Sequence, residues 1–356
     1  MLPVNPWWIA VTSGLLAAIL YGIYRVSLGR GMGQRYREDG PVHHAEKGFV
    51  PTGTGVIMAV LLIVAGIIAL PHVDEQLAGT RLGIYVAWAA ALMGLLGFVD
   101  DRLKVARGSE GLKARYKLPL QIAVGLLLLY LISGYFAEWQ HAQALTGNPL
   151  PWPVYAPWWV YYPVGLFIWL GALNGANFTD GLDGLLSSTT LVVLAGAFYA
   201  LLDGRDPLAL PAAVGFGALA AFLVYNWKPA LIYMGDAGSL AVGALVAGLF
   251  IAKGWWLFLG LCVFIWVVNV ASVMVQVAVY RTTGKRPLLC TPLHHHFELA
   301  GWGERRIVLM FTAMQMLGCV VAFVWLRYGT QWGLAGTAML LGILAVLLIK
   351  YHRRVR

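Results

Sequence analysis

Charged side chains are scarce in this chain of 356 residues. Asp, Glu, Lys and Arg make up 12% of it, whereas 60% of the residues are hydrophobic. Soluble domains have about 25% charged and about 45–50% apolar residues. So few charges do not cover the surface of a soluble globule of this size. The composition therefore excludes a soluble enzyme and indicates a polytopic membrane protein.

Cysteine is also rare. The chain has three cysteines, Cys262, Cys290 and Cys319, an odd number without a CxxC pair. This excludes a disulfide framework and a cysteine metal site. Residues 1–6 lack the basic region of a signal peptide, and the apolar run after Trp7 has no clear cleavage site. We therefore count that run among the membrane helices.

Long apolar runs dominate the chain instead. A helix needs about 20 apolar residues to cross roughly 30 Å of hydrocarbon. We expect an all-α polytopic membrane protein with a single transmembrane domain over residues 1–356 and about eleven spans. The ninth run is long enough to be tilted or bent. The eleven runs are Trp7–Leu28, Pro51–Leu70, Leu82–Val99, Leu118–Ala137, Trp158–Ala176, Leu185–Leu202, Leu208–Tyr225, Ala237–Ala252, Trp255–Tyr280, Ile307–Leu326 and Trp332–Ile349.

Basic residues are distributed unevenly among the loops. If successive loops alternate across the membrane, 21 of the 25 Lys and Arg residues fall on one side and four on the other. Cytoplasmic loops carry the excess of Lys and Arg. The distribution predicts an N-terminus outside, a C-terminus inside and an odd number of spans. Membrane topology thereby accounts for the net charge of +9, and we do not expect nucleic acid as a partner.

The conspicuous polar motifs all fall on the predicted cytoplasmic side. Carboxylates at membrane depth are costly and usually functional. Their oxygens suit Mg²⁺ in combination with phosphate oxygens, and Lys and Arg suit phosphate. The Gly-rich segment before the eighth run could also offer backbone N–H groups to an anion. The combination predicts phosphoryl transfer. The five loops contain REDGPVHHAEKGFVPTGTG, GFVDDRLK, NGANFTDGLDG, NWKPALIYMGDAGS and TPLHHHFELAGWGERR.

Each motif also has a purely structural interpretation. Asp100 and Asp101 could mark a helix end in water, and Asp180 and Asp183 could be turn or cap residues. Lys and Arg residues in such loops more often set the membrane topology or contact lipid head groups than take part in catalysis. Consecutive histidines in an extended segment point in alternating directions, so one metal ion held by all three of residues 294–296 is not expected. We favour substrate contact over Zn²⁺ binding there.

The motifs DDRLK, NFTDGLDG, MGDAGS and PLHHHFEL–GW, in this order, resemble those of the bacterial phospho-N-acetylmuramoyl-pentapeptide transferases. These belong to the polyprenyl-phosphate N-acetylhexosamine-1-phosphate transferase superfamily, and the resemblance runs from about Leu28 to Arg306. It implies Mg²⁺-dependent transfer from UDP-N-acetylmuramoyl-pentapeptide to undecaprenyl phosphate, giving lipid I and UMP in peptidoglycan synthesis. It also implies a homodimer in the lipid of the bacterial cytoplasmic membrane, with the active site on the cytoplasmic face. The family has ten helices, so residues 332–349, in the last helix pair at 307–356, would be an added helix.

The resemblance also assigns roles to residues. Asp236 is the first choice for a Mg²⁺ ligand, followed by Asn177 and Asp180 and then by Asp100 and Asp101. Asp100, rather than Asp101, is expected to deprotonate or orient the lipid phosphate, although adjacent carboxylates titrate as a coupled set. The implied catalytic residues are Asp100, Asp101, Asp236 and His294. The implied substrate-binding residues are Lys47, Thr52, Lys104, Asn177, Asp180, Asp183, Asn226, Tyr233, His294, His295 and His296. Direct attack is favoured over a covalent aspartyl intermediate, because a phosphate oxygen is already anionic near pH 7.

Four positions depart from the family pattern. Gly53 replaces a usual Met, Arg102 a Tyr or small apolar residue, Glu110 a basic residue and Asn269 a Glu. These changes concern loop geometry and substrate affinity.

Two other functions compete with the one that the resemblance implies. One alternative is the sibling enzyme that transfers phospho-N-acetylglucosamine, against which the histidine triad argues. The other is a secondary transporter, which would place its aspartates near the bilayer midplane, often in repeats.

Overall fold

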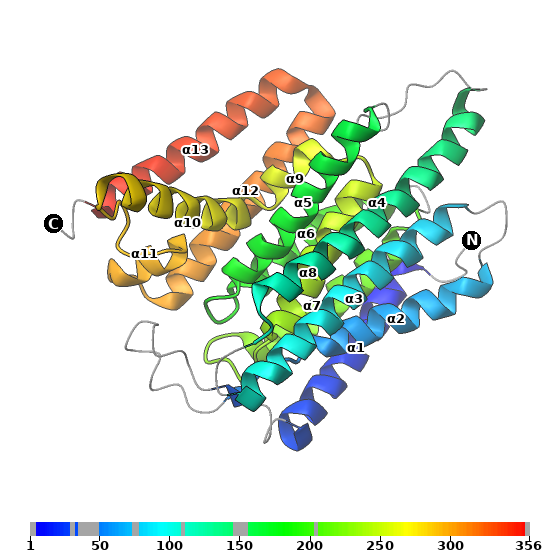
Figure 1. The fold of residues 1–356 in the computed structure, drawn as a ribbon, viewed down its shortest axis with the longest axis horizontal. Coiled ribbons are helices and arrows are strands. Elements are labelled where there is room, and N and C mark those ends of the chain that lie inside the picture. Colours follow the sequence, from blue (N-terminus) through cyan, green and yellow to red (C-terminus); the bar gives the residue numbers. More distant parts are fainter. Residues whose placement is uncertain are drawn as a thin grey trace.

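The computed structural model describes residues 5–28, 33–34, 50–72, 78–107, 111–144, 156–202 and 206–352. These parts are almost entirely helical (Figure 1). The strands β1 (Gly33–Gln34) and β2 (Val50–Pro51) pair antiparallel. The helices are α1 (Pro6–Ile23), which continues as a π-helical turn to Leu28, α2 (Val56–Ala69), which ends in a 3-10 turn to His72, α3 (Ala78–Arg107), α4 (Ala114–Ala144), α5 (Trp158–Thr179), α6 (Leu185–Leu202), α7 (Ala209–Asn226), α8 (Gly235–Ala252), α9 (Trp256–Cys262), α10 (Phe264–Thr283), α11 (Leu293–Leu299), α12 (Glu304–Tyr328) and α13 (Thr330–His352).

A helix lies in every one of the eleven apolar runs, which confirms an all-α polytopic membrane protein. By length and composition, eight helices in the described parts of the chain are able to cross a membrane, and α2 and α6 are shorter apolar helices. The long ninth run is broken at Val263, where φ is −110° and ψ is 34°, so that it forms α9 and α10. The bend expected from its length is therefore present, while the count of eleven spans and the outward N-terminus stay predictions.

The helix α8 lies at the centre of the bundle. Every residue from Ala237 to Ala252 is buried, and α8 packs most extensively against α3 and α5. Small residues let helix backbones approach closely. A Cβ at Gly97 of α3 would collide with the backbone of Asp236, and a Cβ at Gly243 of α8 would lie 2.8 Å from the backbone of Ala172. This close packing brings the last turns of α3 beside the first turn of α8.

The helices after α8 form a second group at one side of the bundle (Figure 1). The helix α10 leaves the bundle at a different angle from α5 and α8, and the short α11 carries the three histidines. The added helix α13 lies on the outside and packs along α12. Gly333 and Gly336 of α13 meet the side chains of Trp325 and Val321 of α12. Most of α13 is exposed, but its Leu340 is fully buried in one apolar cluster with Leu293 and Phe297 of α11.

The loops that carry the polar motifs meet at one end of the bundle. Because the chain reverses direction at each loop, α3, α5 and α7 end where α4, α6 and α8 begin. The helix α3 continues two turns beyond Val99, where the apolar run stops, so the DDRLK motif is helical rather than a loop. An ion pair of 2.6 Å between Asp100 and Lys104, four residues apart, supports these extra turns.

Candidate active site

The first turn of α8 is capped by a side chain from α3. Asp101 is buried, and its Oδ1 and Oδ2 accept the backbone N–H groups of Asp236 at 3.0 Å and Ala237 at 2.9 Å. The first N–H groups of a helix lack partners within the helix, and a carboxylate there also favours the helix dipole. The Gly-rich sequence could present these N–H groups to an anion. Two of them face Asp101 instead, because α3 packs so closely on α8.

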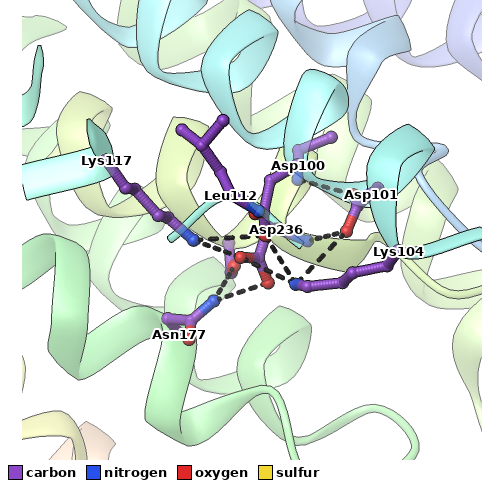
Figure 2. A network of polar contacts seen from close by, with 9 residues as sticks. Asp100, Asp101, Lys104, Leu112, Lys117, Asn177 and Asp236 are labelled. Atoms are coloured by element: carbon purple, nitrogen blue, oxygen red, sulfur yellow. Dashed lines mark hydrogen bonds and ion pairs between the residues drawn. The ribbon is translucent and has the colours of Figure 1, made fainter. Parts of the chain in front are cut away.

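Asp236 lies at the centre of a polar network (Figure 2). Its Oδ1 accepts a hydrogen bond of 3.0 Å from Nδ2 of Asn177, which also lies 2.9 Å from Oγ of Ser239. Its Oδ2 lies 3.0 Å from Nζ of Lys104 and also contacts Nζ of Lys117. Asp236 is therefore bonded to side chains from α3, α4 and α5, and its carboxylate is held in a defined orientation.

Asp100 shares both lysines with Asp236. Its Oδ2 lies 2.6 Å from Nζ of Lys104 and 3.5 Å from Nζ of Lys117, and its Oδ1 accepts the N–H of Leu112. Lys104 is also 3.9 Å from Asp101. Three carboxylates thus face two ammonium groups, which leaves one formal negative charge. This residual charge makes the cluster attractive to a further cation.

Lys117 is the main site residue that sequence reasoning missed. The sequence predicts only a topology role for Lys117, because nothing in its local sequence separates it from the neighbouring basic residues. Its position in the first turn of α4 places its ammonium group between Asp100 and Asp236. Ser239 was missed as well, although it lies three residues, or nearly one helical turn, after Asp236 and therefore on the same face of α8.

The acidic cluster fits a divalent cation. Among the described residues, oxygens of Asp100, Asp101 and Asp236 lie within 4.8 Å of one another. A small set of carboxylate oxygens at this spacing is the donor set that Mg²⁺ uses together with phosphate oxygens and water. Asn177 adjoins the cluster with its amide nitrogen toward Asp236, so coordination by its oxygen would require the amide to turn. Asp180 lies outside the cluster of three.

The turn after α5 brings further carboxyl groups near the cluster. Burial, together with the charges of Asp236, Asp101 and Asp183, raises the pKa of Asp180 to about 8. Asp183 accepts the backbone N–H of Ala230 at 3.2 Å and so ties this turn to the α7–α8 loop. The charge of Asp180 therefore changes near neutral pH.

Two predicted nucleotide contacts lie in the α7–α8 region. Asn226 is buried, and its Oδ1 accepts from the N–H of Gly184 at 3.0 Å and from Ser187, while its Nδ2 donates to the carbonyl of Ile232 at 3.0 Å. These bonds show a loop-fixing role for Asn226, and its contact with a nucleotide stays a prediction. The ring of Tyr233 is half-buried, and burial and the nearby carboxylates raise the pKa of its hydroxyl.

The first loop joins the site through its backbone. Tyr233 N–H donates to the carbonyl of Pro51 at 2.7 Å, and the hydroxyl of Thr54 donates to the carbonyl of Tyr233 at 2.9 Å. Thr52 is buried beside Gly235, close to Asp101. Gly53 has φ of +79°, a conformation that glycine adopts without strain. Glycine therefore suits the backbone of this chain at position 53.

Three further positions from the sequence belong to this face. Lys47 and Glu110 lie outside the described residues, so their predicted positions are not tested. Arg102, the second departure, turns its guanidinium toward the ring of Phe98, with 6.0 Å between the guanidinium carbon and the ring centroid. Arg102 therefore packs along its own helix, on the ring of Phe98.

The histidine segment is helical rather than extended. Residues 294–296 lie in α11, which begins after Pro292, so the expectation of alternating directions is wrong. Pro is favoured at helix starts because its ring fixes φ near the helical value. Each histidine still has a different partner through its Nδ1. For His294 it is Oδ1 of Asn269 at 3.3 Å, for His295 it is Glu298 at 2.9 Å, and for His296 it is the N–H of Leu289 at 3.2 Å.

His294 is the histidine nearest the acidic turn. It is buried, and its Nε2 lies so close to Gly181 that a side chain at Gly181 would collide with it. Gly181 follows Asp180 directly, so the structure brings His294 beside that turn. Asn269, the fourth departure, lies between α5 and α11 and contacts both.

Comparison with known proteins identifies the relatives of this chain. Residues 83–254 match the model of glycosyl transferase family 4. The phospho-N-acetylmuramoyl-pentapeptide-transferase of Carboxydothermus hydrogenoformans is 36% identical over 88% of this chain and 98% of its own length. The proteins of the same name from Desulforamulus reducens and Staphylococcus carnosus are each 34% identical, over 90% and 91% of this chain and over 97% and 99% of their own lengths.

Proposed function

The chain belongs to the phospho-N-acetylmuramoyl-pentapeptide transferases, and on that basis we propose that it makes lipid I. In the proposed reaction, UDP-N-acetylmuramoyl-pentapeptide gives its phospho-sugar to undecaprenyl phosphate, and UMP is released. The observation that carries the proposal is the cluster of Asp100, Asp101 and Asp236 with two lysines at one end of a membrane bundle. Catalysis of phosphoryl transfer rests mainly on positioning and on charge neutralisation, which such a cluster provides.

We propose that Asp236 and Asp100 hold Mg²⁺ and that Asp101 keeps Asp236 in position. When bound, the ion would neutralise phosphate charge and orient the reacting groups. Asp101 uses both oxygens on the backbone of α8, so its main contribution is to fix the start of that helix. Asn177 supports Asp236 from α5. Among our candidate ligands, Asp180 is the one that the cluster geometry supports least.

The two lysines are the groups that would exchange partners on substrate binding. In this structure Lys104 and Lys117 neutralise Asp100 and Asp236. Lysine ammonium groups bind phosphate oxygens as point charges, so incoming phosphates can draw them away from the carboxylates. The same two cations would then stabilise the negative charge that builds up on the pyrophosphate during transfer.

The bond changes follow from the substrates. An oxygen of the lipid phosphate forms a bond to the sugar-proximal phosphorus of the donor, and the bond from that phosphorus to the bridging oxygen breaks. The electron pair leaves with UMP. Asp100 is the residue that we propose orients the lipid phosphate, because it adjoins both lysines and Asp236. Since these carboxylates interact strongly, a protonation change belongs to the set rather than to one residue.

We further propose that the site faces the cytoplasm of a bacterial cell, within a single transmembrane domain in the cytoplasmic membrane. The excess of basic residues in the loops at the end of the bundle that holds the site supports this orientation. The proposed partners are the UDP-linked donor, undecaprenyl phosphate, membrane lipid and a second copy of the chain. A transporter is disfavoured, because the carboxylates lie at one end of the bundle and not at the midplane of the helices.

A paired-substrate assay tests the proposal. The purified protein would be incubated with undecaprenyl phosphate and either UDP-N-acetylmuramoyl-pentapeptide or UDP-N-acetylglucosamine, with and without Mg²⁺, and UMP release would be measured. We expect UMP release only when both UDP-N-acetylmuramoyl-pentapeptide and Mg²⁺ are present. Turnover restricted to UDP-N-acetylglucosamine would assign the chain to the sibling activity, and equal turnover after chelation of divalent ions would refute the role of Mg²⁺.

A further inference from the structure

Asn269 connects two parts of the site that are far apart in the sequence. Its side chain is buried in α10, where its Nδ2 donates to Oγ of Thr179 at 3.1 Å and its Oδ1 lies 3.3 Å from Nδ1 of His294. Thr179 is the last residue of α5, directly before Asp180, and His294 belongs to α11. The amide therefore bridges the acidic turn and the histidine helix.

The direction of each hydrogen bond in this chain can be assigned. The hydroxyl of Thr179 donates its single proton to the carbonyl of Gly175 at 2.7 Å. Toward Asn269, the oxygen of Thr179 can only accept, so the amide nitrogen must face it and the amide oxygen must face His294. An amide oxygen has no proton to donate. The nitrogen Nδ1 of His294 must therefore carry the proton of this bond.

We propose that Asn269 is a positioning residue that fixes His294 as the Nδ1–H tautomer, so that Nε2 accepts a hydrogen bond from the substrate. A neutral imidazole with a proton on Nδ1 has a lone pair on Nε2. An uncharged amide oxygen, unlike a carboxylate, does not add a full negative charge that would hold a second proton on the ring. Gly181, which has no side chain, lets Nε2 lie beside the turn that follows α5.

The tautomer decides what kind of substrate group His294 contacts. This step rests on the proposed function. A lone pair on Nε2 accepts from a hydroxyl or an amide N–H, whereas pyrophosphate oxygens at neutral pH are acceptors themselves. His294 therefore binds a donor group of the sugar or peptide, and the lysines bind the pyrophosphate. The structure thus separates two roles that the histidine motif alone left open.

Nitrogen NMR of ¹⁵N-histidine-labelled protein tests the tautomer without any turnover. We expect a protonated Nδ1 and an unprotonated Nε2 for the signal that disappears in His294→Phe. Asn269→Leu should mix the two tautomers. If the Leu variant does not fold, Asn269→Asp serves instead: it keeps an acceptor but adds a negative charge, so it should retain the proton on Nδ1 and raise the protonated fraction of Nε2. The matched control is Asn174→Leu, because Asn174 bonds only a backbone carbonyl of its own helix among the described contacts, and its histidine spectrum should equal that of the wild type. A protonated Nε2 in the wild type would overturn the proposal.

Binding measurements test the substrate group. The affinities of UDP and of UDP-N-acetylmuramoyl-pentapeptide would be compared for the wild type and His294→Phe. We expect about a tenfold loss for the peptide donor, which is about 1.4 kcal/mol, and no change for UDP. An equal loss for both ligands would mean that His294 contacts the pyrophosphate, and would overturn this part. Wild-type UMP release, measured in parallel, fails only if the proposed function is wrong, so the two failures are distinguishable.

Discussion

The carboxylate of Asp101 holds the backbone of Asp236, 135 positions later in the chain. It accepts the N–H of Asp236 at 3.0 Å and the following N–H of Ala237 at 2.9 Å. One aspartate of the DDRLK motif therefore positions the aspartate of the MGDAGS motif. The two motifs act as one unit because α3 and α8 pack in direct contact.

The cap predicts a combined effect on stability and activity. Asp101→Asn removes the negative charge and one of the two acceptors at the start of α8, so we expect a loss of about 1–2 kcal/mol in stability and at least a tenfold loss of UMP release. Thermal unfolding in detergent and the UMP assay measure both. Asp206→Asn is the matched control. Asp206 lies just before α7 at the other end of the bundle, where it accepts the N–H of Leu208 at 3.0 Å and pairs with Lys253 at 2.6 Å, so this variant should keep wild-type UMP release. Wild-type stability in Asp101→Asn would disprove the cap.

The central carboxylate should be indispensable for turnover. Asp236→Asn keeps the shape of the side chain but removes the charge that faces Lys104 and Lys117. We expect Mg²⁺-dependent UMP release to disappear while the thermal transition of the protein stays cooperative. Near-normal turnover would show that Asp236 is not the principal ligand.

Lys117 is expected to compete with a divalent cation. Its ammonium group lies between Asp100 and Asp236, so Lys117→Met should increase Mn²⁺ affinity by about tenfold, through loss of like-charge repulsion, and should reduce turnover. Electron paramagnetic resonance of bound Mn²⁺ measures the affinity directly. The exposed Lys113 is the matched control, and Lys113→Met should change neither value. Unchanged Mn²⁺ affinity in Lys117→Met would contradict the competition.

The raised pKa of Asp180 predicts a pH-dependent stability. In the folded protein this carboxyl stays protonated up to about pH 8, whereas in the unfolded chain it ionises near its ordinary value of about 3.9. The folded state therefore binds more protons between these values, and its stability decreases as the pH rises through that window. Asp180→Asn, which cannot ionise, should lose this part of the dependence. Identical slopes for both proteins between pH 5 and 8 would refute the raised pKa.

The orientation in the membrane is tested by a fusion. A reporter after Arg356 should give a cytoplasmic signal, because the charge distribution predicts an odd number of spans with the C-terminus inside. A reporter in the loop between α6 and α7, on the side with few basic residues, should give the opposite signal. A periplasmic signal from the C-terminal fusion would mean an even number of spans.

Much of the site was predictable, but the contacts within it were not. The order of the loops predicts that the acidic motifs share one face, and the structure brings Asp100, Asp101 and Asp236 together there. The place of Lys117 among them and the cap made by Asp101 depend on which helices touch. The helical form of the histidine segment was missed, because seven residues are too few for a periodic signal.

The sequence by itself determined the class of the protein, because the length of an apolar run and the side on which its charges lie are local properties with a direct cost in the membrane. It also determined the family, through motifs that stay in order along the chain. Only the tertiary structure decided what each motif does to the others. Gly97 permits α3 to approach α8, and this approach makes Asp101 a cap and Asp236 the centre of the network. Such contacts join residues far apart in the sequence, so no local pattern records them.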